Sequence, residues 1–130
     1  MTRRVTLAGV VAVHLLANLA HGAVHAAVPV ALSSGQGAFV ALVVVLAPVT
    51  GVAFARRGDD AAGAAVVALS LAASLAFGLF FHFAVPNPDH VHAVGGAWSE
   101  SFSATATLIA AVDGAGALVC GWVALSEASQ

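Results

Sequence analysis

Long apolar stretches without a charged residue make up most of the chain. No Asp, Glu, Lys or Arg lies between Arg4 and Arg56, and none lies between Asp60 and Asp89. An apolar stretch of about 18 or more residues without charges is typical of a transmembrane helix, which needs about 20 residues to cross the hydrocarbon core. The pattern therefore predicts membrane-spanning helices rather than a soluble domain.

Turn-forming residues divide these stretches into four helices. The first stretch is long enough for two spans, and Pro29 and the Ser-Ser-Gly segment at 33–35 interrupt it. Pro86 and Pro88 end the third helix, because proline cannot continue a helix. Pro48 predicts a bend inside the second helix, which a membrane helix tolerates when a neighbour satisfies the freed carbonyl. We expect an all-α integral membrane protein, a four-helix up-down bundle forming one domain over residues 1–130, with transmembrane helices at about 5–28, 36–55, 61–85 and 101–126.

The composition supports this class and argues against others. Hydrophobic residues make up 61% of the 130 residues and charged residues 8%, whereas a soluble domain carries about 25% charge. So few charges cannot cover a water-facing surface. The chain has four Arg and no Lys, which argues against nucleic-acid binding. The expected partner is the lipid bilayer, and a homo-oligomer or a larger membrane complex is left open as the assembly.

The positions of the four Arg predict the orientation. Arg3 and Arg4 lie at the N-terminus, and Arg56 and Arg57 lie between the second and third helices. The positive-inside rule then places both termini in the cytoplasm of a multi-pass protein of the cell membrane. The alternative is a signal peptide that is cleaved near residues 24–26, which would leave three spans. The length of the apolar segment and its three His favour an uncleaved helix.

Four polar residues of the first helix lie on one face. At 100° per residue, His14, Asn18, His21 and His25 occupy a ribbon about 60° wide. Ionisable residues within a membrane are costly and usually mark a functional site. The alternative is interhelical hydrogen bonding, which contributes about 0.6 kcal/mol on average. Four aligned polar residues favour a functional role.

Most of the histidines are expected at the outer end of the bundle. His21 and His25 are four residues apart on one helix face, a spacing that suits a shared metal ion. Imidazole together with carboxylate suits Zn, Cu or Fe as a divalent ion. An alternative is b-type haem with His25 and His82 as axial ligands, although the outer loops offer no cation for the propionates. The expected metal ligands are His21, His25, His82, His90 and His92.

Asp113 is the single charged residue near the middle of the fourth helix. A buried, unpaired carboxylate is costly, so Asp113 should be protonated or paired. Its depth matches that of His14 and Asn18, and we expect a contact with one of them. These three residues would form either a proton relay or a structural polar clasp.

Three functions remain open from the sequence. The first is a metal or haem site for redox or electron-transfer chemistry. The second is a subunit for proton or metal-ion transport that uses the polar ribbon and Asp113. The third is a structural accessory subunit of a membrane complex. The sequence contains no nucleotide-binding or hydrolase motif, and whether the protein is an enzyme stays open.

Overall fold

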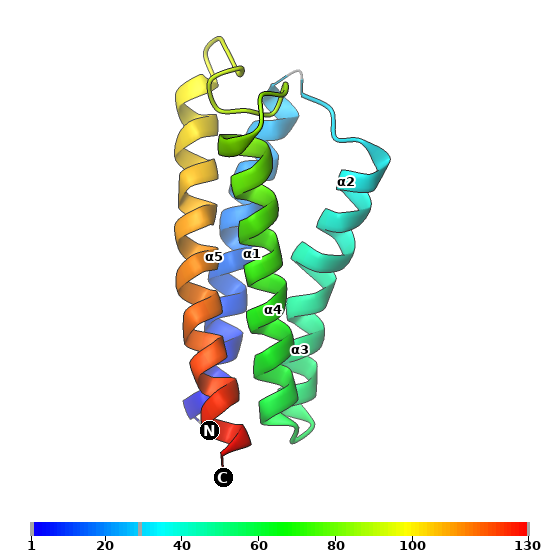
Figure 1. The fold of residues 1–130 in the computed structure, drawn as a ribbon, viewed down its shortest axis with the longest axis vertical. Helices are drawn as coiled ribbons and strands as arrows, with labels where there is room; N and C mark the ends of the chain where they lie inside the picture. The colour runs from blue at the N-terminus through cyan, green and yellow to red at the C-terminus, as the bar shows by residue number, and fades with distance from the viewer. Residues whose placement is uncertain (1, 29, 130) are drawn as a thin grey trace.

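The computed structural model describes residues 2–28 and 30–129, and every regular element in these residues is helical (Figure 1). Pro29, one of the expected helix-dividing residues, lies outside the described residues. Two of the elements, η1 and η2, are π-helical segments that continue a neighbouring α-helix. The elements are α1 (Thr2–Ala27), α2 (Ser34–Phe39), η1 (Val40–Leu46), α3 (Ala47–Arg56), α4 (Asp60–Leu79), η2 (Phe80–Ala84) and α5 (Ser99–Ala128).

Four continuous helical stretches are long and apolar enough to cross a membrane. They are Arg3–Ala27, Ser34–Arg56, Asp60–Ala84 and Ser99–Ala128. Their number and their positions confirm the expected helices to within a few residues at each end. The chain therefore has the build of a multi-pass, all-helical membrane protein.

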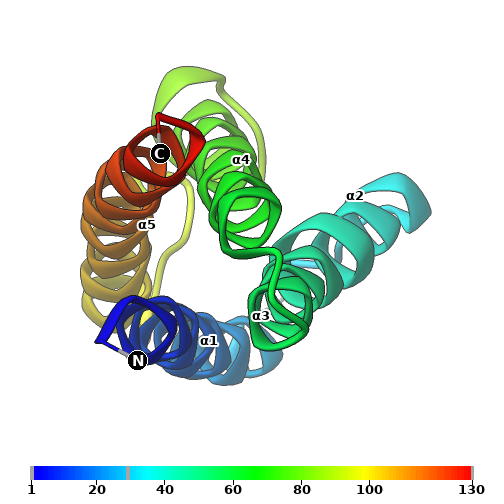
Figure 2. The same cartoon turned by 90° about the horizontal axis from the view of Figure 1, so that it is seen from below.

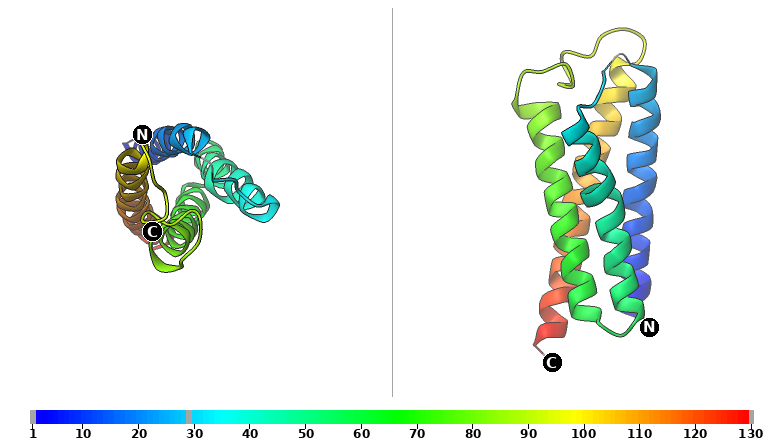
Figure 3. Two further views of the ribbon diagram at one scale, coloured as in Figure 1. Left: turned by 90° about the horizontal axis from the view of Figure 1, so that it is seen from above. Right: turned by 90° about the vertical axis from the view of Figure 1, so that its right-hand side faces the viewer.

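The helices run up and down, and the two chain termini lie at the same end (Figure 1). The α3–α4 turn also lies at this end, which we call the termini end. The loop 85–98 lies at the opposite end, which we call the loop end. Seen along the bundle, α2 diverges from the other helices (Figures 2 and 3), and none of its residues is buried.

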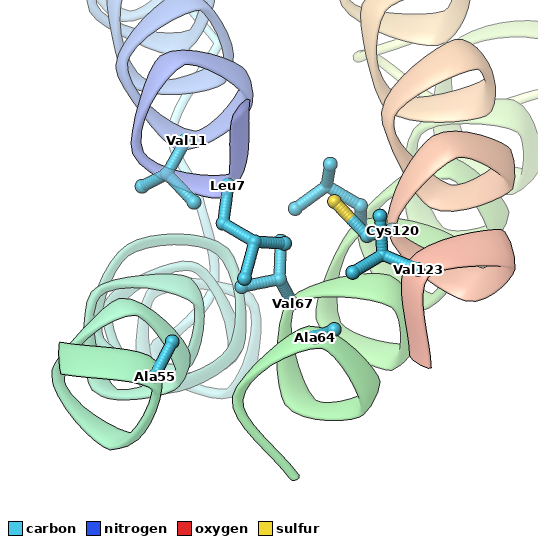
Figure 4. Packing of buried hydrophobic residues seen from close by; sticks show 8 residues of the cluster. Leu7, Val11, Ala55, Ala64, Val67, Cys120 and Val123 are labelled. Carbon is cyan, nitrogen blue, oxygen red and sulfur yellow. The ribbon is translucent and has the colours of Figure 1, made fainter. Parts of the chain in front are cut away.

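Apolar side chains pack in two places. The larger cluster joins α1, α3, α4 and α5 in the half of the bundle nearer the termini, and Leu7, Val67 and Cys120 meet at its centre (Figure 4). The smaller cluster lies beneath the loop 85–98 and centres on Phe102, with Val24 as a neighbour. The space between the two clusters holds most of the buried polar groups.

Two glycines let α3 and α4 approach closely. A Cβ atom at Gly51 would lie 2.7 Å from the backbone oxygen of Gly63, and a Cβ atom at Gly63 would lie 2.6 Å from the oxygen of Gly51. Small residues allow such backbone contact between helices in lipid. This contact holds α3 against α4, while the chain before it, in α2, leans outward.

Each π-helical segment lies just before a proline, and the proline frees a carbonyl. Pro48 has no N–H to offer the oxygen of Val44, four residues earlier, and His14 Nε2 lies 2.8 Å from that oxygen. Pro86 likewise leaves the oxygen of His82 without its helical donor, and the N–H of Val91 donates to it at 2.9 Å. The expected compensation for Pro48 is therefore present, and it comes from a histidine of the polar ribbon.

Candidate metal centre

Three histidines from two helices converge near the loop end. His21 and His25 lie one turn apart on α1, and His82 lies in η2. One ring nitrogen of each lies within 4.8 Å of the others, and the ring centroids are 4.8 to 6.0 Å apart. His21 and His82 are buried and His25 is half-buried. This arrangement, which we call the His cluster, could hold a metal ion.

Asp89 lies against the His cluster, although it was not among the expected ligands. Its carboxylate oxygens are 3.1 Å from His25 Nε2 and 3.5 Å from His82 Nδ1. These are ion-pair distances, yet neither oxygen makes a hydrogen bond to the described residues, and both are buried. The group is therefore a buried carboxylate whose hydrogen-bonding capacity is unused.

The loop that follows η2 fixes the position of Asp89. The side-chain amide of Asn87 donates to the oxygens of Phe81 and Val85, at 2.7 and 2.6 Å. The oxygen of that amide accepts from the N–H of Asp89 at 2.7 Å. Asn87 thus ties the loop to the open carbonyls of η2 and turns the next residues back over the cluster.

Hydrogen bonds determine which nitrogen of His21 is free. His21 Nδ1 lies 2.9 Å from the hydroxyl of Thr105, and this hydroxyl already donates its proton to the oxygen of Ser101 at 2.7 Å. With that donation in place, His21 Nδ1–H donates to Thr105, and Nε2 keeps its lone pair. His21 Nε2 is buried and has no partner among the described residues. An acceptor for the N–H of the opposite ring nitrogen is the usual support of a metal-binding histidine.

His82 has the same arrangement. Its Nδ1 lies 3.0 Å from the backbone oxygen of Asp89, which can only accept, so Nδ1 carries the proton. Nε2 of His82 is then the nitrogen with the lone pair, and a neutral imidazole binds a metal through such a nitrogen. Two of the three histidines therefore have a defined, unprotonated nitrogen available to an ion.

His90 and His92 lie in the loop and are not part of the His cluster. His90 Nε2 donates to the oxygen of Phe83 at 3.1 Å, and His90 Nδ1 accepts from the N–H of His92 at 3.2 Å. Both ring nitrogens of His90 therefore hold the loop together. The side chain of His92 is exposed, with its ring 5.3 Å from that of His90. Of the five expected ligands, the structure brings three together.

His14 and Asp113 form a fully buried pair in the middle of the bundle, as expected. His14 Nδ1 lies 2.6 Å from Asp113 Oδ1, and both side chains are 0% exposed. His14 Nε2 must carry a proton, because it donates to the oxygen of Val44. One further proton is then shared between Nδ1 and the carboxyl group. Asn18 donates to the backbone oxygen of His14 at 2.9 Å and also lies 3.3 Å from His14 Nδ1.

The positive charges lie at the other end of the molecule. Arg4 binds Asp60 through two hydrogen bonds of 2.7 and 3.1 Å, and Arg3 pairs with Glu127. Arg56 and Arg57 end α3 at the same end of the bundle. Asp89 at the loop end therefore has no arginine available to neutralise it.

The rings around the His cluster do not suit haem. The His21 ring lies 4.8 and 4.9 Å from the rings of His25 and His82, which would be the axial pair. The Phe102 ring lies 5.0 and 5.5 Å from the same two rings. A porphyrin needs the space beside the iron that these rings fill. The donor set fits a bare metal ion better.

Comparisons with protein-family models, with curated proteins and with solved structures find no match to this chain.

Proposed function

We propose that the protein is a membrane metal-binding protein that holds a divalent ion with His21, His25, His82 and Asp89. The observation that carries this proposal is the set of unused polar atoms at one point. His21 Nε2 and both carboxylate oxygens of Asp89 are buried without a hydrogen bond to the described residues. A bound cation would satisfy all three.

Electrostatics favours a cation at this point. A buried carboxylate without a full partner costs several kcal/mol, and the arginines that could offset this cost lie at the termini end. Three imidazoles and one carboxylate suit Zn²⁺, Cu²⁺ or Fe²⁺. A bound Cu or Fe ion would supply one-electron chemistry, which is the redox role we favour. The chain's residues would position the ion and, because most of the ligand atoms are buried, limit its contact with water.

We infer that both termini face the cytoplasm of the cell. The four Arg all lie at the termini end, which the positive-inside rule assigns to the cytoplasm. The metal centre then lies near the outer face of the cell membrane. From there it could exchange its ion with the exterior.

Metal analysis of the purified protein tests the proposal. The wild type should carry about one ion per chain, and His21→Ala, His25→Ala and His82→Ala should each lower the content by about tenfold or more at limiting metal, since each removes one of four ligands. His92→Ala is the matched control, because His92 lies in the adjoining loop outside the cluster, and it should keep the wild-type content.

Two results would contradict the proposal. One is a wild-type protein without bound metal that also fails to take up Zn²⁺ or Cu²⁺ on addition. The other is equal loss of metal in His92→Ala and His21→Ala. A Soret band in the absorption spectrum of the purified protein would favour haem instead.

Proton transport is a second candidate, and one observation favours it. Asn18 contacts His14 of the buried His14–Asp113 pair and also lines a cavity that reaches the His cluster. The cavity thus connects the mid-bundle His14–Asp113 pair, through Asn18, to the His cluster at the loop end. Proton flux into liposomes should fall in Asp113→Asn if this candidate holds. A protein with neither metal nor flux would leave the structural accessory role.

A further inference from the structure

A cavity of about 790 Å³ lies beside the His cluster, between α1, η1, α4 and α5. This volume falls in the range of roughly 300–1,000 Å³ that is typical of small-molecule sites. Its walls are mainly apolar, with Leu15, Val40, Phe77 and Ile109 among the lining residues. Its size and walls would accommodate an organic molecule in addition to a metal ion.

The polar groups of the cavity lie at two levels. His21, His25, His82 and Asp89 line the part nearest the loop end. Asn18 and Ser74 line a deeper part, which lies one to about two helical turns farther along α1 and α4. A ligand that fits would have an apolar body and polar atoms on two opposite edges.

The cavity opens sideways between α1 and the diverging α2–η1 segment. The lining residues Leu19, Leu32 and Val45 are 71%, 42% and 43% exposed, so they form its mouth. The outward lean of α2 in Figures 1 and 3 leaves room for this mouth. All three residues are apolar and belong to the membrane-crossing part of the bundle or its edge, so a ligand would enter from lipid.

The cavity offers no cationic side chain to a phospholipid headgroup. No Arg lines the cavity, and the described arginines lie at the termini end. The proposed ion already has three imidazoles and the Asp89 carboxylate as ligands. An uncharged head therefore fits this lining better than a phosphate.

A pair of stacked phenylalanine rings contributes to the wall of the cavity. The rings of Phe77 and Phe39 stack at a centroid distance of 4.5 Å with an angle of 10° between their planes, and Phe77 lines the cavity. This stack closes the space between α4 and the base of α2. A flat ring in the cavity would lie beside it with good contact.

We propose that this cavity binds a membrane-dissolved quinone. A quinone has a flat, uncharged ring with oxygens on opposite edges, which match the two polar levels, and an apolar tail that can leave through the mouth into lipid. The proposal rests on the proposed function in one respect, since the His cluster and its ion form one wall of the cavity. The quinone ring would therefore lie next to the metal.

Gly22 offers a direct way to fill the cavity. Viewed down the axis of α1, Gly22 points in a direction between those of Leu15 and Asn18, on the face that lines the cavity. An added Cβ atom there would meet nothing within 4 Å. Gly121 of α5 has the same open space around it but does not line the cavity. Gly22→Phe and Gly121→Phe are thus a matched pair that adds the same ring inside and outside the proposed site.

Binding of a radiolabelled short-chain benzoquinone to the full-length, metal-loaded protein in lipid nanodiscs tests the proposal. The wild type and Gly121→Phe should bind it saturably, and Gly22→Phe should bind it about tenfold more weakly or worse, because the new ring removes the buried contact area. Gly22→Leu, which adds less volume, replaces Gly22→Phe if the latter does not fold by circular dichroism.

Metal content, measured on the same samples, separates the two proposals. Metal-loaded wild type without saturable quinone binding overturns this inference and leaves the metal site standing. Quinone binding that is equal in wild type and Gly22→Phe also overturns it. A co-purifying phospholipid that the quinone does not displace, found in wild type and absent from Gly22→Phe, would assign the cavity to lipid. Saturable quinone binding to a wild type that holds no metal and fails to take up Zn²⁺ or Cu²⁺ on addition supports the cavity alone and contradicts the metal proposal.

Discussion

Single hydrogen bonds decide the chemistry of the buried histidines. In a bundle with so few polar groups, each donor or acceptor has few partners, so the tautomer of each ring follows from its neighbours. The carbonyl oxygens of Val44 and Asp89 place protons on His14 Nε2 and His82 Nδ1. Thr105 does the same for His21 Nδ1. These neighbours therefore determine which ring nitrogen carries a proton and which keeps a lone pair.

Thr105 should control metal affinity without touching the metal. Thr105→Val keeps the shape of the side chain but removes the hydroxyl that accepts from His21. The preferred tautomer of His21 is then lost, and metal affinity should fall about 10–100-fold, as is usual for such supporting residues. Competition titration with a chelating dye measures this. Thr107→Val, whose hydroxyl bonds only to Ser103 on the same helix, should leave the affinity unchanged. Equal effects of both substitutions would rule out the assigned role.

In the His14–Asp113 pair one proton lies between His14 Nδ1 and Asp113 Oδ1, and a neutral pair avoids burying two charges among apolar helices. Asp113 Oδ2 has no partner among the described residues that would stabilise a carboxylate. Asp113→Asn can donate in the same place and should lower the free energy of unfolding by about 1 kcal/mol or less. Asp113→Ala, which leaves His14 Nδ1 unsatisfied, should cost about 1–3 kcal/mol. Unfolding in mixed micelles measures both. If the pair were charged, Asp113→Asn would leave His14 as a buried cation without a partner and would lower the free energy of unfolding by about 3–5 kcal/mol.

At the scale of helices, two prolines and two glycines set the geometry. Pro48 and Pro86 each follow a π-helical segment whose freed carbonyl is satisfied by another part of the chain. Gly51 and Gly63 bring α3 onto α4. Pro48 lies where α3 continues η1, Pro86 follows the end of η2, and the glycine contact holds α3 against α4.

Replacing Gly63 should destabilise the bundle. A Cβ atom in Gly63→Ala would lie 2.6 Å from the oxygen of Gly51 and 2.7 Å from the nitrogen of Ala55, both of them backbone atoms. The helices would have to move apart, and the expected cost is about 1–3 kcal/mol in the free energy of unfolding. Gly121→Ala, where the added methyl meets nothing within 4 Å, should be neutral or slightly stabilising through helix propensity. Equal melting temperatures of the two variants would disprove the close contact.

The sequence was sufficient for the helices and for much of the site. Charge-free apolar runs and helical periodicity predicted four spans and placed His14, His21 and His25 on one face, since both depend on local spacing. The meeting of His82 with that face followed from matched depth, because the first and third membrane-crossing helices run in the same direction. The sequence did not predict that Asp89, rather than His90 and His92, lies against the His cluster, because this depends on how Asn87 folds the loop. The cavity also escaped prediction, since no local pattern shows that α2 leans outward.

For the molecule as a whole, the separation of charges predicts its orientation. The arginines lie at the termini end, and the loop end carries Asp89 and Glu100. An impermeant maleimide added to intact cells should therefore label Gly95→Cys in the outer loop and leave Ser129→Cys unlabelled until the cells are opened. Cys120 is buried and gives little background. Labelling of Ser129→Cys alone on intact cells would invert the orientation and place the metal centre at the cytoplasmic face.

The sideways mouth of the cavity has a consequence for how affinity is expressed. A ligand that enters through Leu19, Leu32 and Val45 comes from the lipid phase, so its concentration there, as a mole fraction of the bilayer, governs occupancy. Adding empty vesicles or micelles dilutes such a ligand without changing its total amount. The apparent dissociation constant should then rise in proportion to total lipid, whereas that of a water-borne metal ion should not. The quinone and the metal ion would then be distinguished by whether their apparent dissociation constants depend on the amount of lipid, because one enters from lipid and the other from water.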